Sequence, residues 1–554
     1  AVGFAALQLN TEGDSNTASG YFSLYANTTA SENTAMGFES LKANTTGGSN
    51  TGIGEAALRG NTTANNNTGI GRQALYTNTS GASNTAVGKA ALFANTTANN
   101  NTAVGMSALR DNTDGHSNSA LGVNALVTNT TGDANIAIGY QALLSNTTAD
   151  NNTAVGNGSL KFNTTGASNV ALGVSSLAAN TTGAGNCALG REALNNNTTA
   201  SNNTGVGLYA LYANTTGASN TAVGTNSLIA NTTGNSNVAV GETALDANTT
   251  GSNNVAVGRY ALTTSTTGYS NVAVGYATAY SITTGFNNTA MGESALNANT
   301  TASNNTAVGQ TSMYYNTTGA NNTAVGVNSL KGNTTASNNT AVGNDSLNSN
   351  TTGAENVGIG RYALTTNTTG ANNVAMGYNS LGLNTTASNN TAIGFRSLQT
   401  NTTGTYNAAV GASALTANTT GGSNTAMGQG SGYTNTTGGF NTFLGYDARG
   451  SGATVSNQNV IGYNVTSAGA SYTTLGTGIN KSWISHGATS WSGSSDSRLK
   501  DNITTATAGL SFINDLRPVT FEWKAKGDVP VELDSYEEGS TARVNGTDKV
   551  QHGF

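Results

Sequence analysis

Apolar residues recur along this chain with a period of seventeen positions. In the unit from Asn84 to Asn100, NTAVGKAALFANTTANN, a Val precedes Gly88 and Leu92 follows that glycine by four residues. The glycine repeats in register from Gly3 to Gly462, which makes 28 glycines without an insertion or deletion. A fixed period of this length predicts a stacked array of one repeated coil. Leu occupies the position four residues after the glycine in 23 of the 28 units, and the exceptions are Ala279, Met313, Gly432, Arg449 and Thr466.

Within each unit, the short runs NTAVG and (Ala/Ser)-Leu are separated by turn-forming residues. Strands of three to five residues joined by tight corners favour a solenoid over a helix. We therefore expect an all-β fold, an elongated parallel β-solenoid of 17-residue coils. Coils about 4.8 Å apart would give a shaft of roughly 130 Å.

Residues that lie seventeen positions apart form columns along the stack. We expect four of these columns to hold the coil together, and in one unit they are represented by Asn84, Gly88, Leu92 and Asn95. A glycine suits a corner that requires positive φ or leaves no room for Cβ. The column of Asn84 is unbroken from position 16 to position 441, and we expect stacked asparagines to form amide ladders along the axis. The column of Asn95 has a second interpretation, because Asn-Thr-Thr is also an N-glycosylation sequon. The ladder is favoured, since Asn tolerates turn conformations.

Pairs of adjacent apolar residues indicate that several chains assemble side by side. Ala86 precedes Val87, and Ala91 precedes Leu92. Because adjacent strand residues point to opposite faces, one apolar face can fill the coil and the other can pack against another chain. We expect a closed cyclic assembly, and a homotrimer in particular. The alternative is that the outer apolar residues are scattered surface residues.

Composition narrows the function classes. Charged residues make up 8% of the chain, and the net charge is −6 with a pI near 5.1, which does not favour nucleic-acid binding. No apolar run approaches the roughly 20 residues of a membrane helix, so membrane insertion is not expected. Cys187 excludes an intrachain disulfide framework and is expected to be a small packed side chain. The three histidines, His116, His486 and His552, are far apart in sequence, so neither a metal site nor a cofactor is expected.

The repeat weakens near the C-terminal end, which predicts three regions. Residues 1–445 form the shaft, and residues 446–494 form a distal cap or neck. The cap contains Trp483 and Trp491, which pack or serve as a carbohydrate platform. Residues 495–554 begin a different, charged domain, with a helix expected at 510–516 and a strand in VTFEW after Pro518.

Over residues 1 to about 445, the NTAVG-x-x-AL-x-x-NTTG pattern resembles arrays in phage tail-fibre proteins and bacterial surface proteins. It looks more distantly like the head repeats of trimeric autotransporter adhesins, whose period is shorter. The chain begins in mid-repeat, so an anchoring domain is expected before Ala1.

A second resemblance rests on two strings, SSDSRLKDNI from Ser494 to Ile503 and LRPVTFEW from Leu516 to Trp523. They resemble the start of the self-cleaving intramolecular chaperone domain of phage endosialidase tail spikes, a module also similar to one in myelin regulatory factor. The resemblance implies trimerisation, assisted folding of the fibre and a cut between Ser494 and Ser495. Ser495 would be the nucleophile and Lys500 its helper, an arrangement that suits Ser-Lys chemistry. Asp496 is expected to cap a helix, and the family pattern would continue beyond Phe554.

Together these observations predict the shaft of a homotrimeric phage tail fibre, located in the virion, that attaches to a host-surface receptor such as a glycan. No enzymatic activity is expected apart from single-turnover self-cleavage. One alternative is a bacterial cell-surface filament or adhesin located outside the cell. Another is an ice or crystal-surface binder that uses the Thr-Thr columns, although these pairs stand in turns.

Overall fold

The computed structural model describes residues 1–493, 519–521 and 551–553. These residues divide into two compact units, Ala1–Ser492 and Gly493–Phe554. Every regular element in the described ranges is a β-strand, and the strands of the first unit stack in parallel up to an antiparallel hairpin at its end. The prediction of an all-β parallel solenoid is thus confirmed.

The first 26 strands have three residues each. They are β1 (Thr17–Ser19), β2 (Thr34–Met36), β3 (Thr51–Ile53), β4 (Thr68–Ile70), β5 (Thr85–Val87), β6 (Thr102–Val104), β7 (Ser119–Leu121), β8 (Ile136–Ile138), β9 (Thr153–Val155), β10 (Val170–Leu172), β11 (Cys187–Leu189), β12 (Thr204–Val206), β13 (Thr221–Val223), β14 (Val238–Val240), β15 (Val255–Val257), β16 (Val272–Val274), β17 (Thr289–Met291), β18 (Thr306–Val308), β19 (Thr323–Val325), β20 (Thr340–Val342), β21 (Val357–Ile359), β22 (Val374–Met376), β23 (Thr391–Ile393), β24 (Ala408–Val410), β25 (Thr425–Met427) and β26 (Thr442–Leu444).

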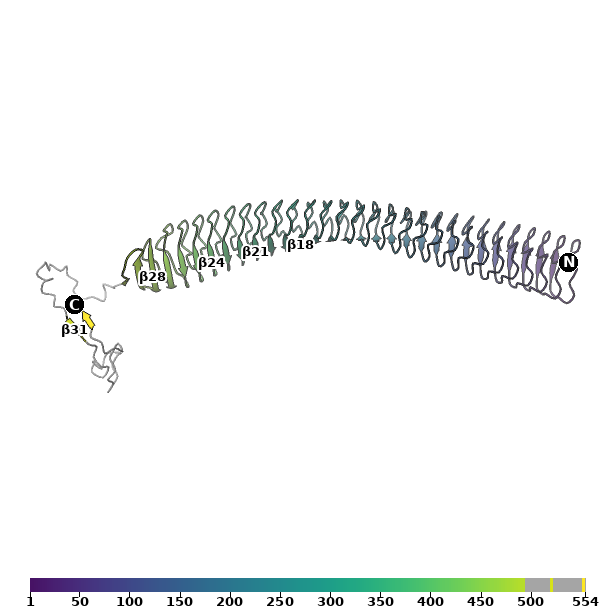
Figure 1. Cartoon of the computed structure of the whole chain (residues 1–554), viewed down its shortest axis with the longest axis horizontal. Coiled ribbons are helices and arrows are strands. Elements are labelled where there is room, and N and C mark those ends of the chain that lie inside the picture. Colours follow the sequence, from purple (N-terminus) through teal and green to yellow (C-terminus); the bar gives the residue numbers. More distant parts are fainter. Residues whose placement is uncertain (494–518, 522–550, 554) are drawn as a thin grey trace, which may run out of the picture. The chain divides into compact units, whose positions relative to one another are not determined.

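Each coil adds one strand to a single long sheet (Figure 1). Thr85, Ala86 and Val87 of β5 pair with the residues seventeen positions later in β6, and the same register holds along the shaft. The middle residue of each strand points into the coil, where Ala86 is fully buried. Because strand residues alternate between faces, the outer two point away from the coil interior.

The anchor glycine ends each strand at a corner that no other residue fits. Gly88 has φ +133°, a conformation that L side chains rarely adopt. A Cβ on Gly88 would also lie 2.5 Å from the carbonyl oxygen of Gly105 in the next coil. Both reasons given for glycine in the sequence therefore apply together.

The second apolar run is not a strand, which corrects the sequence interpretation. Ala90 and Leu92 have φ of +57° and +49°, so the chain turns at alternate residues between Gly88 and Asn95. Ala91 and Leu92 are both fully buried rather than facing opposite sides. The alternation expected of a strand fails here because a left-handed residue rotates its side chain back toward the interior.

The asparagine of the second column forms the predicted amide ladder. Nδ2 of Asn95 donates to Oδ1 of Asn78 at 2.8 Å and to the carbonyl of Ala98 at 3.0 Å. Asn112 donates in turn to Oδ1 of Asn95 at 3.1 Å. The Asn95 side chain is fully buried, so a glycan has no room on it in the folded stack. These bonds support the ladder interpretation over the sequon.

The first column stacks differently. Oδ1 of Asn67 accepts the backbone N–H of Asn84 at 2.9 Å, and Nδ2 of Asn84 donates at 2.9 Å to the carbonyl of Ala98, near the end of the same repeat unit. In this column the main hydrogen bonds join side chains to the backbone. The contact between the two amide side chains, from Nδ2 of Asn84 to Oδ1 of Asn67, is longer, at 3.2 Å. Both columns satisfy polar groups that the narrow coil would otherwise bury unpaired.

At two positions of the Leu column the residue is smaller than Leu, and a larger side chain nearby fills the space. Ala279 stands where other coils have Leu, and Ile282, three residues later, replaces the ladder asparagine and is fully buried in the core. Gly432 likewise replaces Leu, and a Cβ there would meet the ring of Phe443 at 2.5 Å. Phe443 occupies a strand position that is Ala or Gly in the preceding strands, and it fills the missing volume. Close packing of the interior explains both substitutions.

The stack closes with a hairpin. The later strands of the first unit are β27 (Asn459–Tyr463), β28 (Tyr472–Thr477), β29 (Asn480–Ser485) and β30 (Ser492–Gly493), the last of which reaches the first residue of the second unit. β28 pairs in parallel with β27 after a step of fourteen residues, as Gly462 opposite Gly476 shows. β29 then returns antiparallel to β28. In the second unit, β31 (Val519–Phe521) pairs antiparallel with β32 (Gln551–Gly553).

Candidate functional site

The outward face of the long sheet carries an apolar ribbon. The ribbon consists of the residues immediately before each anchor glycine, and 27 of these 28 positions are Val, Ile, Leu or Met, with Ser19 the exception. Leu121 is 50% exposed and Met427 51% exposed, while Val87 is half-buried between its neighbours in the stack. A continuous apolar surface of this length is unusual on a single soluble chain.

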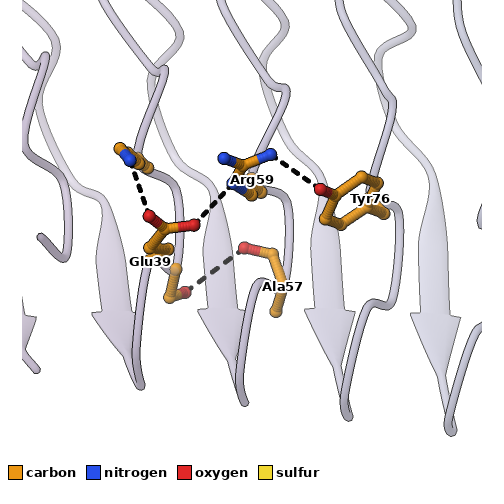
Figure 2. A network of polar contacts seen from close by, with 6 residues as sticks. Glu39, Ala57, Arg59 and Tyr76 are labelled. Carbon is orange, nitrogen blue, oxygen red and sulfur yellow. Dashed lines mark hydrogen bonds and ion pairs between the residues drawn. The ribbon is translucent and has the colours of Figure 1, made fainter. Parts of the chain in front are cut away.

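A cluster of charged and aromatic side chains lies on another side of the coils (Figure 2). Glu39 accepts from Nζ of Lys42 at 2.6 Å and from Nε of Arg59 at 2.7 Å, and Arg59 donates to the hydroxyl of Tyr76 at 2.6 Å. The bond from Lys42, aided by Arg59, lowers the pKa of the Glu39 carboxyl although burial opposes this. Burial would lower the pKa of Arg59, but its bond to Glu39 prevails and the pKa is raised.

Lys42, Arg59 and Tyr76 of this cluster line an open groove of about 520 Å³, together with Tyr25 and small residues of the same loops. The aromatic ring of Tyr76 stacks on Phe93 at 5.1 Å and lies under Arg59 at 5.5 Å, so both of its faces are covered. Both cations are already paired with Glu39. The Tyr76 ring and the two paired cations are therefore already engaged by contacts within the chain.

A smaller groove of about 230 Å³ lies near the end of the shaft. It is lined by Tyr433, Tyr446 and an ion pair of Arg449 with Asp447, and Arg449 also lies 5.2 Å from the centre of the Tyr433 ring. The bond to Asp447 raises the pKa of Arg449. This groove repeats the pattern of the first, with a cation held between a carboxylate and a ring.

The Thr-Thr columns do not form a double array of free hydroxyls. Oγ1 of Thr45 donates to the carbonyl of Thr62 at 3.0 Å, and Thr62 donates to Thr79 in the same way. The following residue is exposed, as at Thr46, and this outer column is Thr in 23 of 25 coils. One column alone is available to solvent, which weakens the ice or crystal-surface interpretation.

The coil core includes neither the two tryptophans of the cap nor the cysteine. Trp483 is half-buried in β29, and Trp491 is 51% exposed. Cys187, expected to be a packed side chain, is half-buried on the outward face of β11. Its position in the strand is two residues before the ribbon residue Leu189.

The predicted cleavage residues Ser494, Ser495 and Lys500 lie outside the described residues, as do Asp496 and the helix expected at 510–516. Of the strand expected in VTFEW, Val519–Phe521 is β31. The structural residues Gly88, Asn84, Leu92 and Asn95 all lie within the described coils, where they form the corner, the two ladders and the core.

Sequence comparison assigns the C-terminal segment. Residues 495–543 match the family model described as chaperone of endosialidase. The chain therefore joins a β-solenoid to a chaperone-of-endosialidase segment. No curated protein and no solved structure matches the chain.

Two further properties hold for the part of the chain that the structure describes. It contains no group of three or more His, Cys, Asp or Glu side chains arranged to hold a metal ion. It also contains no helix of the length and apolarity needed to span a bilayer.

Proposed function

We propose that the chain is the shaft of a homotrimeric tail fibre of a virion, which holds a host-attachment region at a distance. The observation that carries this proposal is that one chain contains an uninterrupted 17-residue solenoid followed, after its closing hairpin, by a segment that matches the chaperone-of-endosialidase family. A stack of this kind has an unpaired sheet edge at each end and long-range strand pairings within, so a folding aid at one end is useful to it. The apolar ribbon supports an assembly of several chains.

The chaperone segment would release itself after folding. Lys500, in its neutral form, would take the proton of the Ser495 hydroxyl, and Oγ would attack the carbonyl carbon of Ser494. The C–N bond between Ser494 and Ser495 breaks as the new C–O bond forms, and the proton passes to the leaving nitrogen. Water then opens the ester, which leaves a carboxylate on Ser494 and a free amine on Ser495.

Intact and native mass of the full chain, compared with Ser495→Ala, test this function. Wild type is expected to lose the segment from Ser495 onward while Ser495→Ala stays whole, and both are expected to be trimers. Lys500→Met should also stay whole. An uncut, monomeric wild-type protein would contradict both the cleavage and the assembly.

A further inference from the structure

The outward sheet face is free of charge along the whole shaft. It consists of two columns, the ribbon itself and the residues two positions earlier, which run from Thr17 to Asn459. None of the 20 Lys and Arg or 26 Asp and Glu residues stands in either column. The second column is mostly Thr and Val, with Cys187 among them, so it is weakly polar at most.

The next column outward has the character of an interface rim. It lies immediately after each anchor glycine and contains large aromatic residues together with charged ones. Arg72 pairs with Glu55, and Arg259 with Glu242, between adjacent coils of this column. An apolar centre bordered by charged and aromatic residues is the usual composition of a protein–protein interface.

We infer that this two-column face is the lateral interface between copies of this chain, which pack in parallel with coils at the same height. The inference rests on the proposed function. It adds which face of each chain forms the contact and how the coils of neighbouring chains are aligned. The apolar side chains on this face repeat every ~4.8 Å along the shaft. A partner that contacts them along the full length must have the same rise per coil, and a second copy of this chain has that rise.

The area of the face is sufficient for a stable assembly. The two columns are about 7 Å apart and extend for roughly 130 Å, which gives a strip of about 900 Å² on each chain. In a closed ring, the Thr and Val column of one chain meets the ribbon of the next, so each chain divides the strip between its two neighbours. The total of about 900 Å² buried on each chain is similar to the roughly 800 Å² that a chain buries in a stable interface.

Cys187 reports on this arrangement because it is the single cysteine of the chain and lies on the face. In the assembly its thiol should be shielded from alkylation by a maleimide, because it lies within the buried interface. The control carries Cys187→Ser with Thr199→Cys, which moves the thiol to the exposed threonine column of the same coil. Its alkylation should be at least about tenfold faster.

A charge variant tests the same face independently. Val206→Glu with Val223→Glu should convert the assembly to monomers in native mass spectrometry, whereas Thr216→Glu with Thr233→Glu should leave it intact. The ribbon side chain Val223 is 36% exposed on the single chain, so the charge does not enter the coil core.

The outcomes separate the face from the function. Trimers in which Cys187 is protected from alkylation support the inference. Trimers in which Cys187 reacts as fast as the control thiol overturn the face but leave the trimeric fibre in place. A monomer with reactive Cys187 overturns both.

Discussion

At the residue scale, the coil depends on backbone positions that most side chains avoid. Each repeat combines an anchor glycine with left-handed residues such as Ala90, Leu92 and Asn100. Non-glycine residues in this region cost roughly 1–2 kcal/mol each. Inter-coil hydrogen bonds, such as that from the N–H of Leu92 to the carbonyl of Ala108, and burial of the Leu side chain offset that cost.

Two neighbouring glycines differ in both φ and space, since Gly156 has φ +137°, which is nearly exclusive to glycine, and Gly158 has φ +62°, which other residues tolerate. A Cβ on Gly156 would lie 2.6 Å from the carbonyl carbon of Gly173, whereas one on Gly158 would meet nothing nearer than 3.8 Å. Both have positive φ, and Ala90 occupies the position equivalent to Gly158. Gly156→Ala should destabilise the coil by about 3 kcal/mol and Gly158→Ala by less than about 1 kcal/mol. Thermal unfolding measures both, and equal losses would contradict the backbone clash.

Asp246 gives a pH-dependent prediction. Burial raises the pKa of its carboxyl, although backbone N–H groups partly oppose this, and Oδ1 has no hydrogen-bond partner. Because the folded-state pKa lies above the unfolded one, the stabilisation is present below pH 3.8 and is lost as the pH rises through the folded-state pKa. Asp246→Asn should therefore stabilise the protein at pH 7 by up to about 1 kcal/mol and have little effect at pH 3.

Unfolding curves at the two pH values test this, with Asp150→Asn as the control. Oδ1 of Asp150 already accepts the N–H of Asp133 at 2.8 Å, so that variant should change little at pH 7. A gain for Asp246→Asn that is as large at pH 3 as at pH 7 would contradict the titration argument.

At the element scale, the ladder of the Asn95 column has one interruption. Ser265 and Ile282 stand in two successive coils where other coils have Asn. Oδ1 of Asn248 and Oγ of Ser265 are consequently buried without partners. Ser265→Asn should supply a donor to Oδ1 of Asn248, as Asn248 itself donates to Asn231 at 2.7 Å.

The expected gain from Ser265→Asn is about 1 kcal/mol, the usual net value of one hydrogen bond. Ser265→Ala is the matched control, because it removes the unpaired hydroxyl but leaves Oδ1 of Asn248 without a donor. Hydrogen exchange of the neighbouring coils compares the two variants. The same protection in both would show that the ladder does not carry the stability.

Sequence alone predicted the columns but not the path of the chain between them. The 17-residue period was informative, and so were two of its columns. The column of Gly88 requires positive φ, and the column of Asn95 requires an amide side chain for the ladder. Leu92 was misleading, since Leu favours strands and helices and its left-handed conformation follows from inter-coil packing. The buried pairing of Ala91 with Leu92 could not be predicted for the same reason.

The residues that break the repeat reveal packing contacts that are not apparent from the sequence. Gly432 looks like decay of the pattern until Phe443 of the next strand is seen to fill its space. The contact joins residues of different coils, so a column-by-column comparison misses it. The cleavage residues Ser495 and Lys500 rest on sequence resemblance, and the family match to residues 495–543 covers both.

At the scale of the whole molecule, the account distinguishes two apolar surfaces with different roles. The interior is filled by the middle strand residue and the Leu column, and it stabilises one chain. The ribbon lies outside and is charge-free over the length of the shaft, and we assign it to contacts between chains. A solenoid with both surfaces can be long and thin while it still buries enough apolar area through assembly.

Electron cryomicroscopy of the full-length protein tests the central claim most directly. The account predicts a rise of about 4.8 Å per 17-residue coil and a cross-section of three coils around one axis, with the ribbon at the centre. A cross-section of one coil with the ribbon in solvent, or three coils joined through another face, would contradict it.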